Sequence, residues 1–130
     1  MEISESSAQL LSWEKKSFAH LALMLADGTP HCTPLWFDYD GTHLIINSAR
    51  GRVKDKAMRQ SPQVAVAISD PDDPYRYIQI RGLVTEITEE GALAMIDHLS
   101  DKYRGVPFDH HGNETRVTYK ILPESIETNI

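Results

Sequence analysis

The stretch "QVAVAISDPDDPYRYIQIRGLVTEIT", residues 63–88, decides the fold of this chain. It divides into an apolar strand at 63–69, a rigid loop at 70–74 and a long alternating strand at 75–88. In the long strand, apolar side chains on one face alternate with polar or aromatic side chains on the other: Ile78, Ile80 and Val84 against Tyr77, Gln79 and Arg81. Gly82 interrupts the run and predicts a bend or bulge of the kind a closing barrel needs. The stretch therefore predicts two antiparallel neighbours in a strongly curved sheet.

Further strands are predicted on both sides of this pair. Asp-Gly turns at 27–28 and 40–41 predict that the first three strands form an antiparallel meander. The strands lie at 18–25, 31–39, 43–49 and 115–122, the last running on past Pro123, and the helices at 7–16, 52–60 and 89–104. About six antiparallel strands with no βαβ rhythm predict a mainly β fold, a small barrel with flanking helices, as a single domain over residues 1–130.

Residues 89–104 give the strongest helix signal. Ala92, Met95, Ile96, Leu99 and Tyr103 recur at helical spacing on one stripe. We expect Thr88 to cap its start, with Glu89 and Glu90 in the first turn, and Gly105 to end it.

Composition narrows the classes of function. The longest apolar run, at 21–25, is too short to span a bilayer, which argues against a membrane protein. An acidic balance, with a formal net charge of -6, argues against nucleic-acid binding. One cysteine, Cys32, excludes an internal disulfide and is typical of a cytoplasmic protein.

Positive charge gathers in one segment of this acidic chain. Residues 50–59 hold five of the thirteen Lys and Arg residues against one acid, so the segment carries +4 and the remainder -10. Arg52 and Lys54 fall in the first turn of the predicted 52–60 helix, where the helix dipole disfavours cations. A bound phosphate would make these two cations favourable at the helix start, and Ser48 would add a hydroxyl to the site. The alternative is a solvated basic surface.

Several blocks resemble a known family when taken together. "TPLWF" (33–37), "NSARGR" (47–52) and "SPQVAVAISDPDDPYRYIQIRG" (61–82) resemble the flavin and deazaflavin oxidoreductase superfamily. The likeness is greatest to the F420-dependent enzymes of its pyridoxamine 5'-phosphate oxidase-like branch. The resemblance covers roughly residues 18–120 and implies a six-stranded split β-barrel. The R-x-x-L-L-K block of true pyridoxamine phosphate oxidases is missing, and "HCTPLW" (31–36) stands there instead.

The resemblance also implies a cofactor site in a homodimer. Ser48, Arg52 and Lys54 would grip the cofactor phosphate, with Asn47, Ala49 and Arg50 beside them. The ring would lie against Thr33, Pro34 and Trp36. Tyr77 and Gln79 would flank the ring or the partner subunit, and Arg59 and Lys56 would line a groove for the acidic tail of F420.

Coenzyme F420 is the expected cofactor, and reduced deazaflavin would pass a hydride to a small-molecule substrate. FMN on the same fold, or a non-catalytic module that binds a cofactor or haem, are the alternatives. The sequence assigns no catalytic residue. A metal site is not expected, because the adjacent pair His110 and His111 is a poor ligand set.

Overall fold

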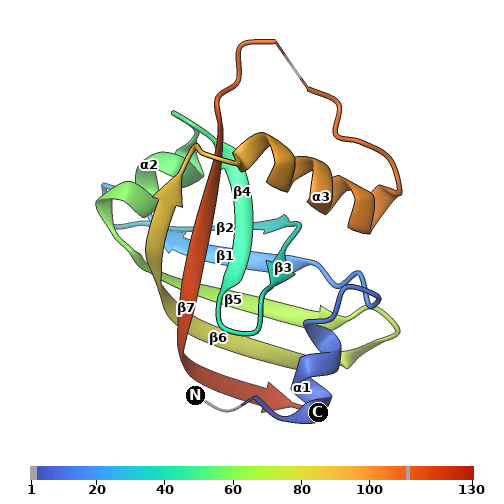
Figure 1. The fold of residues 1–130 in the computed structure, drawn as a ribbon. Helices are drawn as coiled ribbons and strands as arrows, with labels where there is room; N and C mark the ends of the chain where they lie inside the picture. The colour runs from blue at the N-terminus through green and yellow to red at the C-terminus, as the bar shows by residue number, and fades with distance from the viewer. Residues whose placement is uncertain (1–2, 111) are drawn as a thin grey trace.

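The computed structural model describes residues 3–110 and 112–130. Seven strands and three helices follow each other along the chain (Figure 1). Their bounds are α1 Glu5–Leu10, β1 Ala19–Met24, β2 Pro30–Leu35, β3 Asp38–Tyr39, β4 Leu44–Ala49, α2 Val53–Gln60, β5 Gln63–Asp70, β6 Asp73–Thr88, α3 Ala92–Arg104 and β7 Arg116–Asn129.

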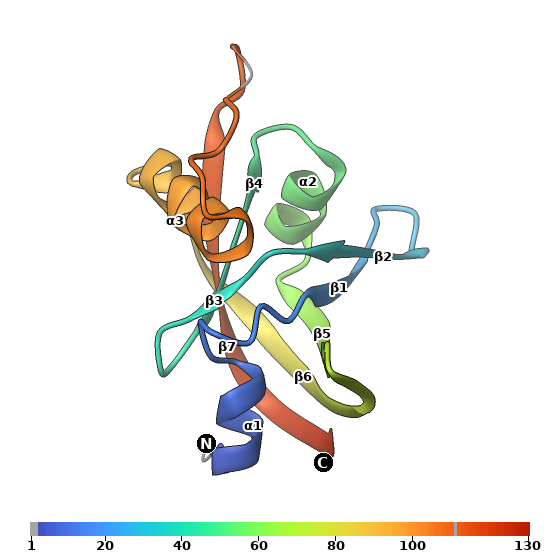
Figure 2. The same ribbon diagram turned by 90° about the vertical axis from the view of Figure 1, so that its right-hand side faces the viewer.

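All seven strands belong to one antiparallel sheet in the order β2-β1-β5-β6-β7-β4-β3. The two edge strands, β2 and β3, are consecutive in the chain and only Trp36 and Phe37 separate them. Because a residue spans at most about 3.6 Å, the sheet must curl until its edges approach. Figures 1 and 2 show this curl, and the predicted barrel-like β fold is confirmed.

The strand predicted at 31–39 is in fact two strands, which raises the count from six to seven. Its first part, β2, pairs with β1 as the first Asp-Gly turn predicts. Its last two residues, β3, pair with β4 at the opposite edge of the sheet. The predicted three-strand meander is therefore wrong, because Phe37 leaves the sheet and is fully buried between the two edges.

The long strand β6 confirms its alternation. Ile78 and Ile80 are fully buried in the core, whereas Tyr77 and Arg81 are exposed on the outer face. The pairing with β7 shifts register between Arg81 and Gly82, which is the predicted irregularity. A Cβ at Gly82 would lie 2.5 Å from the carbonyl oxygen of Leu122, so the close approach of β7 also requires glycine there.

Two prolines protect the free edge of β2. Pro34 pairs with His20 and Pro30 with Met24 across the β1 hairpin. A proline has no N–H to donate, so it fits an edge strand whose outward donors have no neighbour. The prediction that Pro34 marks an edge is confirmed, and the prolines make β2 a poor template for pairing with another strand.

The helices lie at the two ends of the curled sheet. Figures 1 and 2 place α2 and α3 together at one end and α1 at the other. The predicted helix at 7–16 forms earlier and shorter, as α1, with Ser4 as its N-cap. Helix α3 begins three residues later than predicted, because a turn over residues 89–91 follows β6 and Gly91, with φ 76°, forms the N-cap in place of Thr88.

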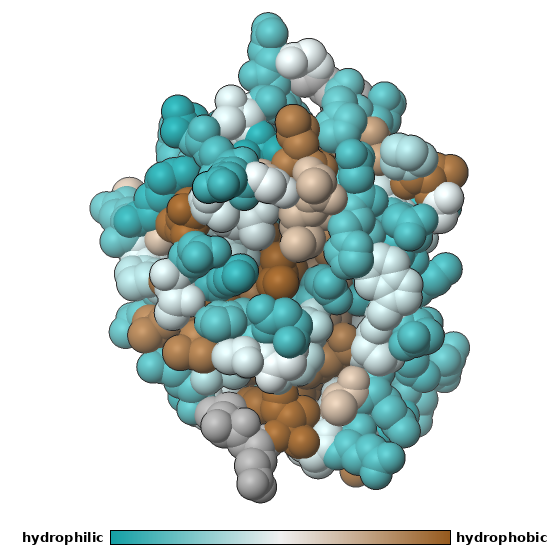
Figure 3. Space-filling model, in the orientation of Figure 1, coloured by the Kyte–Doolittle hydropathy of each residue, from teal (hydrophilic) through white to brown (hydrophobic). Residues whose placement is uncertain are grey.

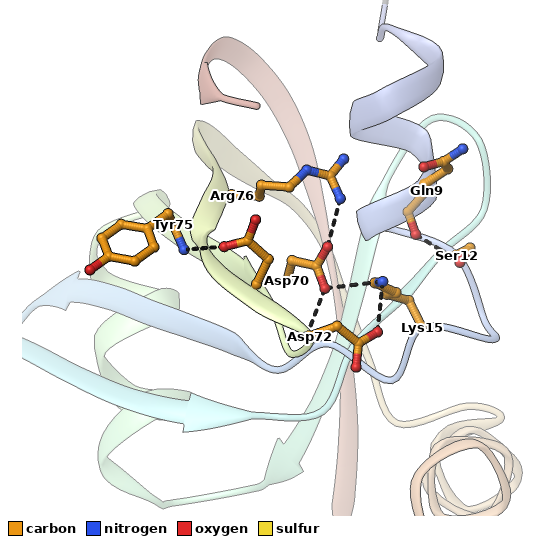
Figure 4. Close-up of polar contacts among 8 residues, drawn as sticks. Gln9, Ser12, Lys15, Asp70, Asp72, Tyr75 and Arg76 are labelled. Carbon is orange, nitrogen blue, oxygen red and sulfur yellow. Dashed lines mark hydrogen bonds and ion pairs between the residues drawn. The ribbon is translucent and has the colours of Figure 1, made fainter.

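A buried carboxylate holds the end that carries α1. Asp70 is 2% exposed at the end of β5 and pairs with Lys15 Nζ at 3.0 Å and with Arg76 at 2.7 Å. Lys15 also reaches Asp72 at 3.0 Å (Figure 4). Burial would raise the pKa of Asp70, but the Asp72 N–H and the cations outweigh it and lower the pKa. The cluster ties the β5–β6 hairpin to the segment before β1.

Candidate functional site

A pocket of about 290 Å³ opens at the end of the sheet that carries α2 and α3. We call it the α2–α3 pocket. Its walls come from the end of β2, from β4, from both helices, from the loop after α3 and from the start of β7: Pro34, Leu35, Trp36, Asn47, Ser48, Arg52, Lys54, Ile96, Leu99, Phe108 and Arg116. The space-filling view shows hydrophilic side chains over most of the face drawn in Figure 1, with hydrophobic atoms in a hollow towards its middle (Figure 3).

The start of α2 gives this pocket hydrogen-bond donors that are not used within the protein. Arg52 is the N-cap and its side chain does not cap the helix. Within residues 3–110 and 112–130, the backbone N–H groups of Val53 and Lys54 have no hydrogen-bond partner. Such groups point outwards along the helix axis and favour a negative charge. The local chemistry at this wall therefore suits an anion.

Lys54 adds an uncompensated positive charge. No carboxylate of the described chain forms an ion pair with it. Burial, and then the neighbouring Arg52, lower the pKa of its ammonium group. A cation held under these conditions costs free energy until an anion joins it.

Ser48 lies beside these cations at the end of β4. Its side chain is 4% exposed, and its hydroxyl forms no hydrogen bond to another described residue. Ser48 lines the pocket, so this hydroxyl is free to form a hydrogen bond with a ligand there. Ser48, Lys54 and the α2 amides together fit the oxygen atoms of a phosphate.

Two arginines at the pocket share one carboxylate. Arg52 pairs with Glu114, and Arg116, 5% exposed at its side chain, donates to the other oxygen of Glu114 at 3.1 Å. The Nε of Arg116 donates to Asn47 at 2.9 Å. Burial would raise the pKa of Glu114, but both arginines outweigh it and lower the pKa. The Glu114 carboxylate therefore already occupies some of the hydrogen-bond donors of Arg52 and Arg116.

The opposite wall is aromatic. The ring of Trp36 stacks on Tyr103, with 5.5 Å between centroids and 7° between planes. Phe108 meets Trp36 edge-on at 6.4 Å and lies 5.0 Å beneath the guanidinium group of Arg116. A flat apolar wall beside an anion subsite is suited to a planar ring that carries a phosphate.

The structure brings six predicted site residues to this one pocket: Pro34, Trp36, Asn47, Ser48, Arg52 and Lys54. Ala49 and Arg50 line a neighbouring pocket of about 490 Å³, which shares Arg52 with the α2–α3 pocket. Thr33 precedes the lining residues, and its buried hydroxyl has no hydrogen-bond partner in the described chain.

Three predicted residues lie away from the pocket within one chain. Arg59 donates to Asp55 at 2.9 Å. Tyr77 pairs with Asn129, and Gln79 with Glu127, on the β6–β7 ladder. The side chains of Tyr77 and Gln79 face outwards from the sheet.

Sequence reasoning missed Arg116 and Phe108. Arg116 is the first residue of an alternating strand, and the β4–β7 pairing places it beside Asn47 and Ser48. No local sequence pattern predicts that pairing. Phe108 lies in the loop after α3, and its N–H donates to Asp97 at 3.1 Å.

No cluster of three or more metal-ligating side chains occurs in residues 3–110 and 112–130. His110 contacts Asp97 at 3.0 Å, and His111 lies outside the described residues. None of the described helices has the length and apolar character needed to cross a membrane.

Comparisons with known proteins agree with the barrel-like fold. Residues 7–129 match the family model described as pyridoxamine 5'-phosphate oxidase. A solved structure described as an F420 reductase is 32% identical, with a TM-score of 0.85 over 96% of this chain and 98% of that one. No curated protein sequence matches significantly.

Two further solved structures share the fold. A pyridoxamine 5'-phosphate oxidase-like protein from Listeria innocua is 25% identical, with a TM-score of 0.74 over 98% of both chains. A conserved hypothetical protein from Mycobacterium tuberculosis is 21% identical, with a TM-score of 0.75 over 98% of this chain and 85% of that one.

Proposed function

The chain belongs to the pyridoxamine 5'-phosphate oxidase family, and from this premise we propose that it is an oxidoreductase that binds coenzyme F420 by its phosphate. The substrate would be a small unsaturated or oxidised organic molecule. The observation that carries the proposal is a group of unused donors between the end of β4 and the start of α2: Ser48, Lys54 and the free backbone N–H groups of α2. The likeness to a protein described as an F420 reductase supports the choice of F420.

Each wall of the pocket has a task in this proposal. Ser48, Arg52 and Lys54 bind the phosphate, and Arg116 holds Asn47 in place beside them. Trp36 and Pro34 form the surface against which the ring lies. Bound there, the reduced cofactor supplies the hydride. The protein would orient the ring, and Trp36 and Phe108 would exclude water from the pocket that they line.

Binding experiments with two cofactors test this proposal. The purified protein is titrated with F420 and with FMN while cofactor fluorescence is followed. F420 binding at micromolar concentration or tighter, with weaker FMN binding, is expected. Tight FMN binding with no response to F420 would replace the proposal with an FMN enzyme on the same fold. If the protein binds the reduced cofactor but no oxidised substrate reoxidises it, a non-catalytic carrier module is favoured instead. A titration with haem would then test whether that module binds haem.

We also propose that the active form is a homodimer. The outer face of β1 and β5 carries small side chains, including Ala22, Ala65 and Ala67, next to exposed Tyr77. An exposed face of this kind suits a second copy of the chain. Tyr77 and Gln79 would then meet the partner subunit. Light scattering after size exclusion tests this, and a monomer at micromolar concentration would contradict it.

A further inference from the structure

The two residues that join the edges of the sheet are held by a pair of side chains from the last turn of α3. Phe37 is fully buried and lies between β2 and β3. Its carbonyl oxygen accepts a hydrogen bond from Lys102 Nζ at 3.0 Å. Its N–H donates to the Tyr103 hydroxyl at 3.4 Å, and that hydroxyl also donates to the Ser17 carbonyl. Lys102 and Tyr103 thus satisfy both backbone groups of Phe37.

Lys102 is an unusual residue for this place. It is 1% exposed, and no carboxylate within the described residues forms an ion pair with it. Its ammonium group instead lies 4.4 Å from the ring centroid of Phe37 and 5.0 Å from that of Tyr103. A buried cation without an ionic partner is costly. The hydrogen bond to the Phe37 carbonyl and the surrounding rings offset part of that cost. An apolar side chain would remove this donor from the buried carbonyl, so Lys102 holds the backbone at Phe37 in a way that an apolar residue could not.

The contacts that fix Phe37 also affect the pocket, because the residue before it, Trp36, is part of the pocket wall. Trp36 precedes Phe37 and lines the α2–α3 pocket. Its ring stacks on Tyr103, whose hydroxyl is the same group that contacts Phe37. The last turn of α3 thus fixes the backbone after Trp36 and one face of its ring.

We propose that Lys102 and Tyr103 are positioning residues that set the orientation of Trp36 as the ring-binding wall of the pocket. The role in cofactor binding rests on the proposed function, whereas the effect on Trp36 does not. Neither side chain touches the cofactor in this proposal. They act through Phe37 and through the stacked ring.

Trp36 fluorescence provides a direct test without cofactor. Trp13 is the only other tryptophan, and its ring centroid lies 5.9 Å from Lys102 Nζ, so a Trp13→Phe background keeps an aromatic ring beside the ammonium group and leaves Trp36 as the single reporter. In this background Lys102→Met should shift the Trp36 emission maximum and at least double its quenching by acrylamide. Lys102→Arg keeps a donor and should restore part of the difference. Tyr103→Phe keeps the stacked ring and should give a smaller shift, which provides a second variant if Lys102→Met does not fold.

Arg104→Met is the matched control, because Arg104 is an exposed cation in the same helical turn. It should leave Trp36 emission unchanged. Titration of the same variants with F420 and FMN separates the two proposals. If Trp36 responds but the parent binds neither cofactor, the proposed function fails and the positioning stands. If the parent binds a cofactor while neither Lys102→Met nor Tyr103→Phe changes Trp36 emission, quenching or affinity, the positioning inference is overturned.

Discussion

The Tyr119 hydroxyl donates a hydrogen bond to Asp55 at 2.6 Å, although the two residues are 64 positions apart in the chain. Tyr119 is fully buried on β7, and Asp55, 2% exposed, lies in the first turn of α2. Asp55 also accepts from the Gly51 N–H and from Arg59, both at 2.9 Å. The start of α2 is therefore fixed over β7, directly behind the donors that face the α2–α3 pocket.

Replacing Tyr119 with Phe should lower the free energy of unfolding by about 1–3 kcal/mol, because Asp55 then stays buried with one donor fewer. Burial would raise the pKa of Asp55, but the Tyr119, Gly51 and Arg59 donors outweigh it and lower the pKa. Its contribution is therefore present above its ordinary pKa of 3.8 and is lost as the pH falls through the lower folded value. Urea unfolding at pH 7 and below pH 4 measures both effects, and the difference should narrow in acid. Tyr75→Phe, at an exposed position, is the control, and equal midpoints for Tyr119→Phe and the parent at pH 7 would contradict the prediction.

A Gly82→Ala substitution should destabilise the sheet at the bulge. The new Cβ would lie 2.5 Å from the Leu122 carbonyl oxygen, and backbone has to move to relieve that contact. We expect a loss of about 2–3 kcal/mol, measured by urea unfolding. Gly105→Ala is the comparison, because Gly105 has φ 72° and open space around it, so its cost of about 1 kcal/mol is conformational only. If Gly82→Ala lowers the free energy of unfolding no more than Gly105→Ala does, the β7 backbone moves aside at little cost and the prediction is wrong.

Features that depend on local pattern could be predicted from the sequence. The alternation of β6, the irregularity at Gly82 and the edge position of Pro34 each follow from a few adjacent residues, and all three are confirmed. The gathering of Ser48 and Lys54 at one pocket was also expected, because strand, turn and helix follow directly along the chain.

Features that depend on distant partners could not be predicted. Residues 31–39 look like one strand, and the break at Phe37 depends on Lys102 and Tyr103, which lie 65 and 66 positions later. The start of α3 was also misplaced, by three residues. The Thr88 hydroxyl accepts from the Glu90 N–H at 3.1 Å, but it does so in a turn, and the helix begins only after Gly91.

Lys54→Met should weaken cofactor binding at least tenfold, because the charge-assisted hydrogen bond to the phosphate is worth about 1.5–3 kcal/mol. Folding should be unaffected or slightly improved, since burial and Arg52 both disfavour this cation. Removing Arg52 as well should weaken binding further. Fluorescence titration at two salt concentrations measures the affinity, and the thermal midpoint checks the fold. Lys16→Met, at an exposed position before β1 and outside the lining of the pocket, is the control, and an unchanged affinity in Lys54→Met would place the phosphate elsewhere.

Glu114→Gln should strengthen the binding of a small anion. Glu114 pairs with both Arg52 and Arg116, so its charge competes with any anion for the same guanidinium groups. The amide keeps a hydrogen-bond acceptor and removes that charge. We expect a gain of several-fold in affinity for FMN or inorganic phosphate, measured by competition with the bound cofactor. Glu124→Gln, at an exposed position, provides the control, and weaker binding in Glu114→Gln would mean that Glu114 organises the arginines for the ligand.

The stability of the protein should rise with pH between about 8 and 10 because of Lys102. Burial lowers the pKa of Lys102 to about 8, although Asp38 and Glu14 oppose the shift. An unfolded chain keeps this proton up to its ordinary pKa of 10.5, so it binds more protons than the folded chain in that range. The folded protein therefore carries the cost of the buried charge below pH 8 and is relieved of it as the pH rises. The expected gain is about 2 kcal/mol over the interval.

Urea unfolding of the parent and of Lys102→Met across this range isolates the effect. Other charged groups face Lys102, namely Asp38 with its partner His98, and Glu14. They are present in both proteins, so the difference between the two curves belongs to Lys102. Burial raises the pKa of Tyr103 above its ordinary 10.0, so this residue lowers stability as the pH approaches 10, but it is present in both proteins and cancels from the difference. The parent should become more stable relative to Lys102→Met as the pH rises, and parallel curves would mean that water or a carboxylate compensates the ammonium group in solution.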